Sequence, residues 1–142
     1  MLAFEVLPNL RKQAKSEGLV RAIDEHLEQT KEHAKRLEPV FRAVGAEPSS
    51  NHSPPAEKLA EHHDELAGSI PNDRLADVFH AIAATATEHF EIACYDALLA
   101  LADAVALEKD ARDALEQNRK QEEQALKTLR SELERLVAEL ER

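Results

Sequence analysis

Hydrophobic residues recur every three or four positions along most of this chain, and glycine and proline divide that pattern into segments. This spacing is typical of amphipathic helices. We expect four main helices, over about 2–16, 19–44, 74–106 and 109 to the end. A weaker helical stretch follows the turn-rich segment 45–55, over about 56–70. Pro8 implies a kink or a late start in the first helix, and Asp73 is a plausible N-cap for the third long one.

The lengths of these helices predict how they pack. A helix of about 33 residues is about 50 Å long, which suits long antiparallel partners better than a small globular domain. Segment 46–72 is long enough to cross the bundle, so helices 19–44 and 74–106 can run parallel, as in ferritin-like bundles with one long crossover. We therefore expect an all-α fold, a ferritin-like four-helix bundle with a short extra helix in the crossover, forming one domain over 1–142. The short first helix leaves one end open or covered by another subunit.

Charge and composition restrict the partners. The chain has 28 acidic and 18 basic residues and a net charge of −10, which disfavours nucleic acid and anionic lipid. No apolar run approaches the ~18 residues of a membrane span, and the first residues lack a signal-peptide pattern. A single cysteine, Cys94, suits a reducing compartment. We expect a soluble, cytoplasmic protein whose partners are divalent metal ions or a basic molecule.

Polar residues interrupt the apolar seams of three helices. They are Glu88 and Glu91 on the third long helix, Glu122 on the last, and His26, Thr30 and His33 at the seam edge of the second. A buried carboxylate without a partner is strongly disfavoured, because removing its charge from water costs several kcal/mol. Mutual pairing or a shared cation explains such a cluster, and di-iron and di-manganese bundles are built in this way.

Other interpretations of these residues remain open. A second stripe on the third long helix, which includes His89, would turn Glu91 outward, although we favour Glu91 and Glu122 pointing inward. His33 suits an inward or a half-exposed position equally. His89 lies on the stripe opposite Glu91 and is the poorer ligand. We expect His62 and His63 on the surface, and Cys94 as a small core residue.

Three segments, "LPNLRKQAKS", "HLEQTKEHAKRLEPVFRAVGAEP" and "TEHFEIACYDALLALA", resemble in order parts of the YciE and YciF stress-protein family. The resemblance covers residues 2–130, and its most specific piece is the Glu-His-aromatic-Glu-Ile-Ala-x-Tyr run at 88–95. It implies a ferritin-like bundle, often dimeric, with a two-metal site at its middle and a link to stress responses.

The family's ligand pattern maps only partly onto this chain. The resemblance implies metal ligands at His33, Glu88, Glu91 and Glu122. Three other positions depart from the pattern, because Gln29 replaces the usual Glu, Ala125 occupies a histidine position of better known ferritin-like proteins, and the ligand Glu of the first helix falls just before Met1. Glu5, the only acid nearby, lies off the required face. The site is therefore expected to be partial or degenerate, holding one or two Fe or Mn ions, or none.

Two functions follow from these observations. The first is a stress-associated, ferritin-like protein with a partial di-metal carboxylate site. The second is a metal-free structural or interaction bundle that forms a homodimer through an apolar groove left by the short first helix. An enzyme with a Ser, Cys or His nucleophile finds no support, because no nucleophile elbow or phosphate-binding glycine loop is present.

Overall fold

The computed structural model describes residues 2–49 and 54–142 and is helical throughout, with no strand in those residues. It contains five helices, α1 (Leu2–Gln13), α2 (Glu17–Val44), α3 (Pro54–Ala67), α4 (Asp73–Ala104) and α5 (Lys109–Leu140). The all-α class and the order of the five elements are confirmed, with ends that shift by only a few residues. None of these helices is both long and apolar enough to cross a membrane.

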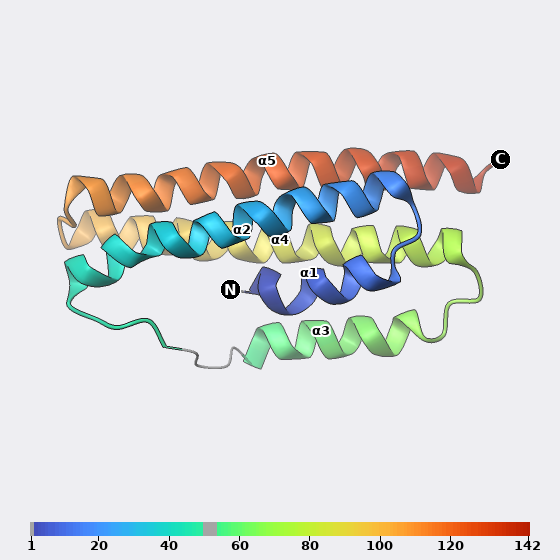
Figure 1. Ribbon diagram of the computed structural model, residues 1–142, viewed down its shortest axis with the longest axis horizontal. Helices are drawn as coiled ribbons and strands as arrows, with labels where there is room; N and C mark the ends of the chain where they lie inside the picture. Colours follow the sequence, from blue (N-terminus) through green and yellow to red (C-terminus); the bar gives the residue numbers. More distant parts are fainter. Residues whose placement is uncertain (1, 50–53) are drawn as a thin grey trace.

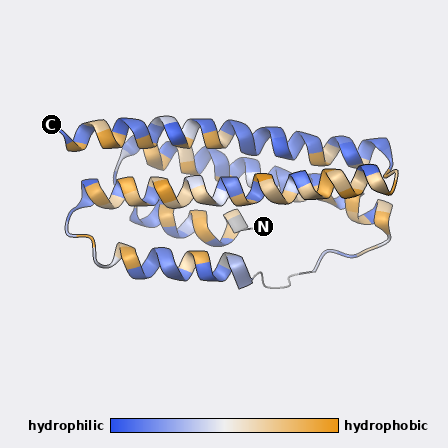
Figure 2. Cartoon of the chain, turned by 180° about the vertical axis from the view of Figure 1, so that it is seen from behind, coloured by the Kyte–Doolittle hydropathy of each residue, from blue (hydrophilic) through white to orange (hydrophobic). Residues whose placement is uncertain are grey.

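Four helices lie side by side along the long axis of the molecule, and α3 lies outside them (Figure 1). α5 packs along both α4 and α2, while α1 fills the remaining side between α2 and α4. As expected from the long crossover, α2 and α4 run in the same direction, opposite to α1 and α5. In the connection from the end of α2 to the start of α4, α3 packs on α1 and α4. Figure 2 shows that α4 is largely hydrophobic, whereas α5 is mostly hydrophilic.

The helix ends follow local chemistry. The side chain of Asn72 caps α4 by accepting a hydrogen bond from the backbone N–H of Leu75, so Asp73 is the first helical residue and the predicted N-cap was one position late. α2 ends at Gly45, whose φ of 65° suits a residue without a Cβ. α1 begins at Leu2 and continues through Pro8.

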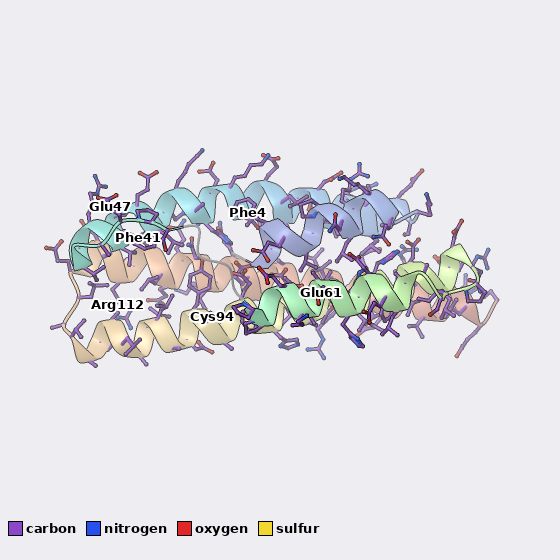
Figure 3. The ribbon with its side chains drawn as sticks, turned by 90° about the horizontal axis from the view of Figure 1, so that it is seen from below. Phe4, Phe41, Glu47, Glu61, Cys94 and Arg112 are labelled. Atoms are coloured by element: carbon purple, nitrogen blue, oxygen red, sulfur yellow. The ribbon has the colours of Figure 1, made fainter. Side chains whose placement is uncertain are left out.

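The core has two apolar parts with polar residues between them. The larger part surrounds α1, with Leu7 and Leu10 packed with Leu19, Ile23 and Leu129. The smaller part lies toward the far ends of α2 and α4, around Tyr95, Ala102 and Leu115. α1 and α3 accompany only one half of the bundle, and Phe41 and Arg112 lie in the other half (Figure 3).

A heptad extended along α4 runs through Ala84, Thr87 and Glu91 and then through Cys94, Leu98, Leu101 and Val105. Its first three residues are buried and its last four are exposed, whereas Tyr95 and Ala102, off that heptad, are buried. A straight helix has 3.6 residues per turn, so its buried face drifts away from a strict heptad. Cys94 is therefore a surface residue, and the prediction of a core position was wrong.

Candidate metal centre

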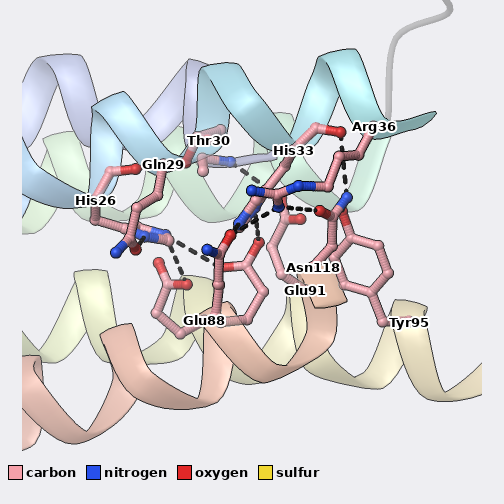
Figure 4. A network of polar contacts seen from close by, with 12 residues as sticks. His26, Gln29, Thr30, His33, Arg36, Glu88, Glu91, Tyr95 and Asn118 are labelled. Atoms are coloured by element: carbon pink, nitrogen blue, oxygen red, sulfur yellow. Dashed lines mark hydrogen bonds and ion pairs between the residues drawn. The ribbon is translucent and has the colours of Figure 1, made fainter. Parts of the chain in front are cut away.

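The polar cluster lies between the two apolar parts, where α2, α4 and α5 face one another (Figure 4). His26 and His33 are seven residues apart on α2, two turns along one face, so both rings point inward. Glu88 and Glu91 lie one turn apart on α4, and Glu122 is on α5. Each helix places its own polar residues by the period of its apolar stripe, and the packing of the three helices brings them together.

Three side chains form the centre of the cluster. The Nε2 atom of His26 lies 2.9 Å from Oε2 of Glu88 and 3.2 Å from Oε2 of Glu122. All three residues are buried, and both glutamates are 0% exposed. One ligand atom from each lies within 4.8 Å of the other two. In the described residues this is the only group of three or more His, Cys, Asp or Glu side chains that close together.

The facing atoms of this centre lack hydrogen bonds, although they are in close contact. Nε2 of His26, both carboxylate oxygens of Glu88 and Oε2 of Glu122 are buried without a hydrogen-bond partner among the described residues. The His26 contacts are therefore ion-pair contacts without hydrogen-bond alignment. Most buried polar atoms in proteins have a hydrogen-bond partner, so four buried atoms on these three side chains without a hydrogen bond indicate a missing partner.

The three side chains of the centre change one another's pKa values. Burial alone would lower the pKa of His26, but its contacts with Glu122 and Glu88 raise that pKa to about 10. Burial raises the pKa of Glu88 above its usual range, opposed by His26. Burial also disfavours ionised Glu122, yet His26 and His33 hold the pKa of this carboxyl below its usual range. Without an ion, the imidazolium of His26 compensates the ionised Glu122.

A chain of hydrogen bonds connects the centre to the surface along α2 and α5. His33 places Nδ1 2.9 Å from Oε1 of Glu122 and Nε2 2.8 Å from Oε1 of Gln121. Nη1 of Arg36 donates to the same oxygen of Gln121 and to Oδ1 of Asn118, both at 2.7 Å. Asn118 is fully buried and donates to the hydroxyl of Tyr95 and to the carbonyl of His33.

Glu91 lies at the edge of the cluster, toward α1. Its Oε1 accepts a hydrogen bond from the backbone N–H of Ala3 at 3.2 Å. Burial and repulsion from Glu122 raise the pKa of Glu91, and the Ala3 N–H opposes that shift. α1 therefore offers this carboxylate a backbone N–H, and its nearest acid, Glu5, is exposed as the sequence predicted.

The structure brings the four predicted ligand residues into one cluster and adds His26 to it. Glu88, Glu91, Glu122 and His33 are all buried in the cluster, and for His33 this decides between the inward and half-exposed positions that the sequence left open. His26 was noted at the seam edge but not included among the predicted ligands, although its seven-residue spacing from His33 was a usable signal.

Other predicted positions have mixed outcomes. His62 is exposed, as expected, His89 is exposed as well, and Ala125 is buried. Gln29 is half-buried, with Oε1 3.4 Å from Nδ1 of His26. His63 was wrongly placed on the surface, because α3 packs its ring against α4, where Nε2 lies 3.0 Å from Nδ1 of His80.

The donor set of the centre fits one divalent ion. Two ligand atoms at 90° on an ion, with bonds of about 2.1 Å, are about 3 Å apart, close to the two His26 contacts. One imidazole and two carboxylates suit Mn, Fe or Zn. Nδ1 of His26 lies 3.4 Å from Oε1 of Gln29, and its other nitrogen, Nε2, is directed at the carboxylates. Histidine ligands of metals are commonly oriented in this way by a partner on the second ring nitrogen.

Comparisons with known proteins agree with this architecture. A family model described as a domain of unknown function, DUF892, matches residues 1–140. YcfI from Rhodopseudomonas palustris is similar in structure, with a TM-score of 0.84 and 32% identity, over 90% of this chain and 81% of that one. The stress protein YciF from E. coli matches with a TM-score of 0.86 and 25% identity, over 96% of this chain and 86% of that one. A search of curated proteins finds no match.

The family match spans nearly the whole chain, and a stress protein of the group that the sequence resembles shares its fold. The chain therefore belongs to the DUF892 family, which includes proteins of the YciE and YciF type.

Proposed function

We propose that this protein is a ferritin-like, stress-associated cytoplasmic protein that binds one divalent cation of the Fe or Mn class between His26, Glu88 and Glu122. The observation that carries the proposal is the set of four buried polar atoms on these residues that lack a hydrogen bond. A cation would supply the missing partner to all three side chains and would take the place of the proton on Nε2 of His26. We propose binding and assign no reaction to the site.

The charge and ligand count favour one ion over two. The centre supplies two carboxylates and one imidazole, which can neutralise a single divalent charge. Glu91 is the next carboxylate available, and it is hydrogen-bonded to the backbone of α1. Gln29 is uncharged, and Glu5 is exposed, so a second ion would have too few negative ligands.

Metal content and affinity test the proposal. Purified, chelator-treated protein should take up about one Mn(II) or Fe(II) per chain in anaerobic titration followed by elemental analysis. Glu122→Gln should abolish this uptake, because the amide removes a charged ligand at the centre. Glu123→Gln is the matched control, since its neighbouring carboxylate faces outward and pairs with Arg119. Equal uptake by wild type and Glu122→Gln, or no uptake by wild type, would contradict the proposal.

A second candidate function has its own observation. Phe90, Cys94, Leu98 and Leu101 of α4, with Val105 directly after its last residue, form an exposed apolar stripe, in which Leu101 is 61% and Val105 68% exposed. Their spacing of three or four residues keeps them on one face over about four turns. Apolar surface of this kind is typical of protein interfaces. It supports a structural bundle that forms a homodimer, with or without an ion.

Charges beside this stripe favour a second copy as the partner. The chain has a net charge of −10, so two copies repel one another over most of their surface. On this part of α4, however, Asp96 pairs with Arg119 and Asp103 pairs with Arg112. Both acids are neutralised within the same chain. Two copies can therefore meet along α4 with little charge repulsion.

A further inference from the structure

The chain Arg36–Gln121–His33–Glu122 joins the surface of the bundle to one carboxylate of the proposed metal centre. The donors and acceptors from Arg36 to Nε2 of His33 can be assigned from chemistry alone. A guanidinium only donates hydrogen bonds, so the atoms of Asn118 and Gln121 that lie 2.7 Å from Arg36 must be oxygens. The other side of Asn118 confirms its orientation, because its Nδ2 meets the carbonyl of His33, which only accepts.

This orientation of Gln121 decides the state of His33. The same Oε1 that accepts from Arg36 lies 2.8 Å from Nε2 of His33, so Nε2 must carry a hydrogen and donate it. A protonated ring nitrogen has no lone pair to offer an ion. The other nitrogen, Nδ1, is already 2.9 Å from Oε1 of Glu122. Both nitrogens of His33 are therefore engaged by α5 side chains.

The consequence for Glu122 is a fixed carboxylate with one free oxygen. Oε1 is held by His33, and Oε2 is buried without a hydrogen bond and lies 3.2 Å from Nε2 of His26. A rigid partner on one oxygen keeps the other directed at the centre, which is how partners outside the ligand set commonly orient metal ligands.

From this geometry we propose that His33 positions Glu122 and does not bind the ion, and that Arg36 and Gln121 hold His33 in that role. This inference rests on the proposed metal centre and assigns it a single imidazole ligand, from His26. It replaces the sequence-based expectation of a His33 ligand. Arg36 and Gln121 become positioning residues, although neither reaches the centre.

The first arm of the test counts imidazoles on the ion. X-ray absorption of Co(II)-loaded protein should show one imidazole in wild type and one in His33→Gln, whereas His26→Gln should lose it. Gln121→Met keeps the side-chain length but removes the acceptor, so it should weaken Co(II) affinity by about 10- to 100-fold with the imidazole count unchanged. Gln124→Met, on the exposed side of α5, is the matched control and should bind normally. Two imidazoles in wild type and one in His33→Gln would overturn the proposal.

The second arm uses metal-free protein, so that it does not depend on the proposed function. Nitrogen NMR should show Nε2 of His33 bearing a slowly exchanging proton in wild type and in Gln124→Met. That proton should exchange rapidly in Gln121→Met, or in Arg36→Met if Gln121→Met does not fold. An unprotonated Nε2 in wild type would overturn the hydrogen-bond chain itself. Failure of Co(II) to bind wild type, with the NMR result as expected, would instead remove the metal centre and leave His33 as a partner of Glu122 alone.

Discussion

The buried charged side chains of the polar cluster lower the stability of the fold, and the same side chains form the proposed metal site. Glu88 and Glu122 are completely buried, and the facing nitrogen of His26 is their shared cationic partner. Buried ion pairs are expensive because both charges leave water, and they become far more expensive when one partner is removed. His26 and Glu88 should therefore affect stability in opposite directions, since His26 supplies the only positive charge that touches both carboxylates.

For the metal-free protein, we expect His26→Leu to lower the free energy of unfolding by about 3 kcal/mol, because it leaves buried carboxylates without a cation. Glu88→Gln should leave stability unchanged or raise it by up to about 2 kcal/mol, because it removes a buried carboxyl group whose ionisation the folded state opposes. Urea denaturation with a chelator present measures both. A larger loss for Glu88→Gln than for His26→Leu would contradict this account of the cluster.

The pH dependence of stability should carry the signature of Glu88. Burial raises the folded-state pKa of this carboxyl above its unfolded value of 4.5, so its contribution to stability is fully present below 4.5 and is lost as the pH rises through the folded-state value. Glu88→Gln removes that contribution. The stability of Glu88→Gln relative to wild type should therefore increase steadily from pH 5 to pH 8.

Urea denaturation of metal-free protein at several pH values measures this difference. Glu123→Gln, which removes a carboxylate on the outer face of α5 that pairs with Arg119, is the matched control for the same measurements. A constant difference for Glu88→Gln would show that Glu88 ionises normally in the folded protein.

Among the helices, α3 is attached to the bundle through a buried pair of histidine side chains. Among the described residues it contacts helices α1 and α4 only, and His63 provides a buried polar contact. Nε2 of His63 lies 3.0 Å from Nδ1 of His80, and the His63 ring stacks on Phe79 at 5.2 Å. Such a pair requires one ring nitrogen to donate and the other to accept. Protonation of both rings would remove the acceptor and place two positive charges together.

We expect acid to loosen α3 before the rest of the bundle. Burial lowers the pKa of His80, as does repulsion from His63, while Asp77 and Asp64 oppose the shift. A lowered folded-state pKa means that this contribution to docking is present above the unfolded value of 6.5 and is lost as the pH falls below it. Deuterium exchange in residues 58–67, corrected for intrinsic rates, should therefore increase between pH 7.5 and pH 5.

His80→Leu cannot be protonated, so its α3 should exchange with little dependence on pH. His62→Gln, at an exposed neighbouring position, should behave like wild type. The same acid-induced opening in His80→Leu as in wild type would show that another group controls the docking of α3.

At the scale of the whole molecule, the short first helix divides the protein into two unlike halves. α1 and α3 cover one half, whose apolar core is large. The other half has a small core, and α4 exposes its apolar stripe there. The proposed metal centre lies at the boundary. Association through the stripe would cover the thinner half without reaching the centre's ligands, so dimerisation and metal binding are expected to be independent.

Leu101→Glu should shift the protein from dimer to monomer, because it places a charge on the most exposed leucine of the stripe. Size-exclusion chromatography with light scattering at micromolar concentration measures the change, and metal uptake should remain that of wild type. Val137→Glu is the matched control, since it adds the same charge to an exposed apolar residue near the end of α5. A monomeric wild-type protein would rule out a dimer of this affinity.

The sequence by itself determined the five helices and their order, and it favoured an inward direction for the candidate glutamates. Periodicity reports these features because the face that a residue occupies is a property of its own helix. Glu88, Glu91 and Glu122 could therefore be placed inside before any packing was known, and the spacing of His26 from His33 held the same information.

Only the tertiary structure decided which of these residues meet and what covers them. His26 rather than His33 faces both glutamates because Arg36 and Gln121, on different helices, engage His33 from the other side. His63 is buried because α3 docks on α4, and Leu101 is exposed because none of the described helices packs over it. Each of these outcomes depends on a partner far away in the chain, and the period of a single helix carries no information about its neighbours.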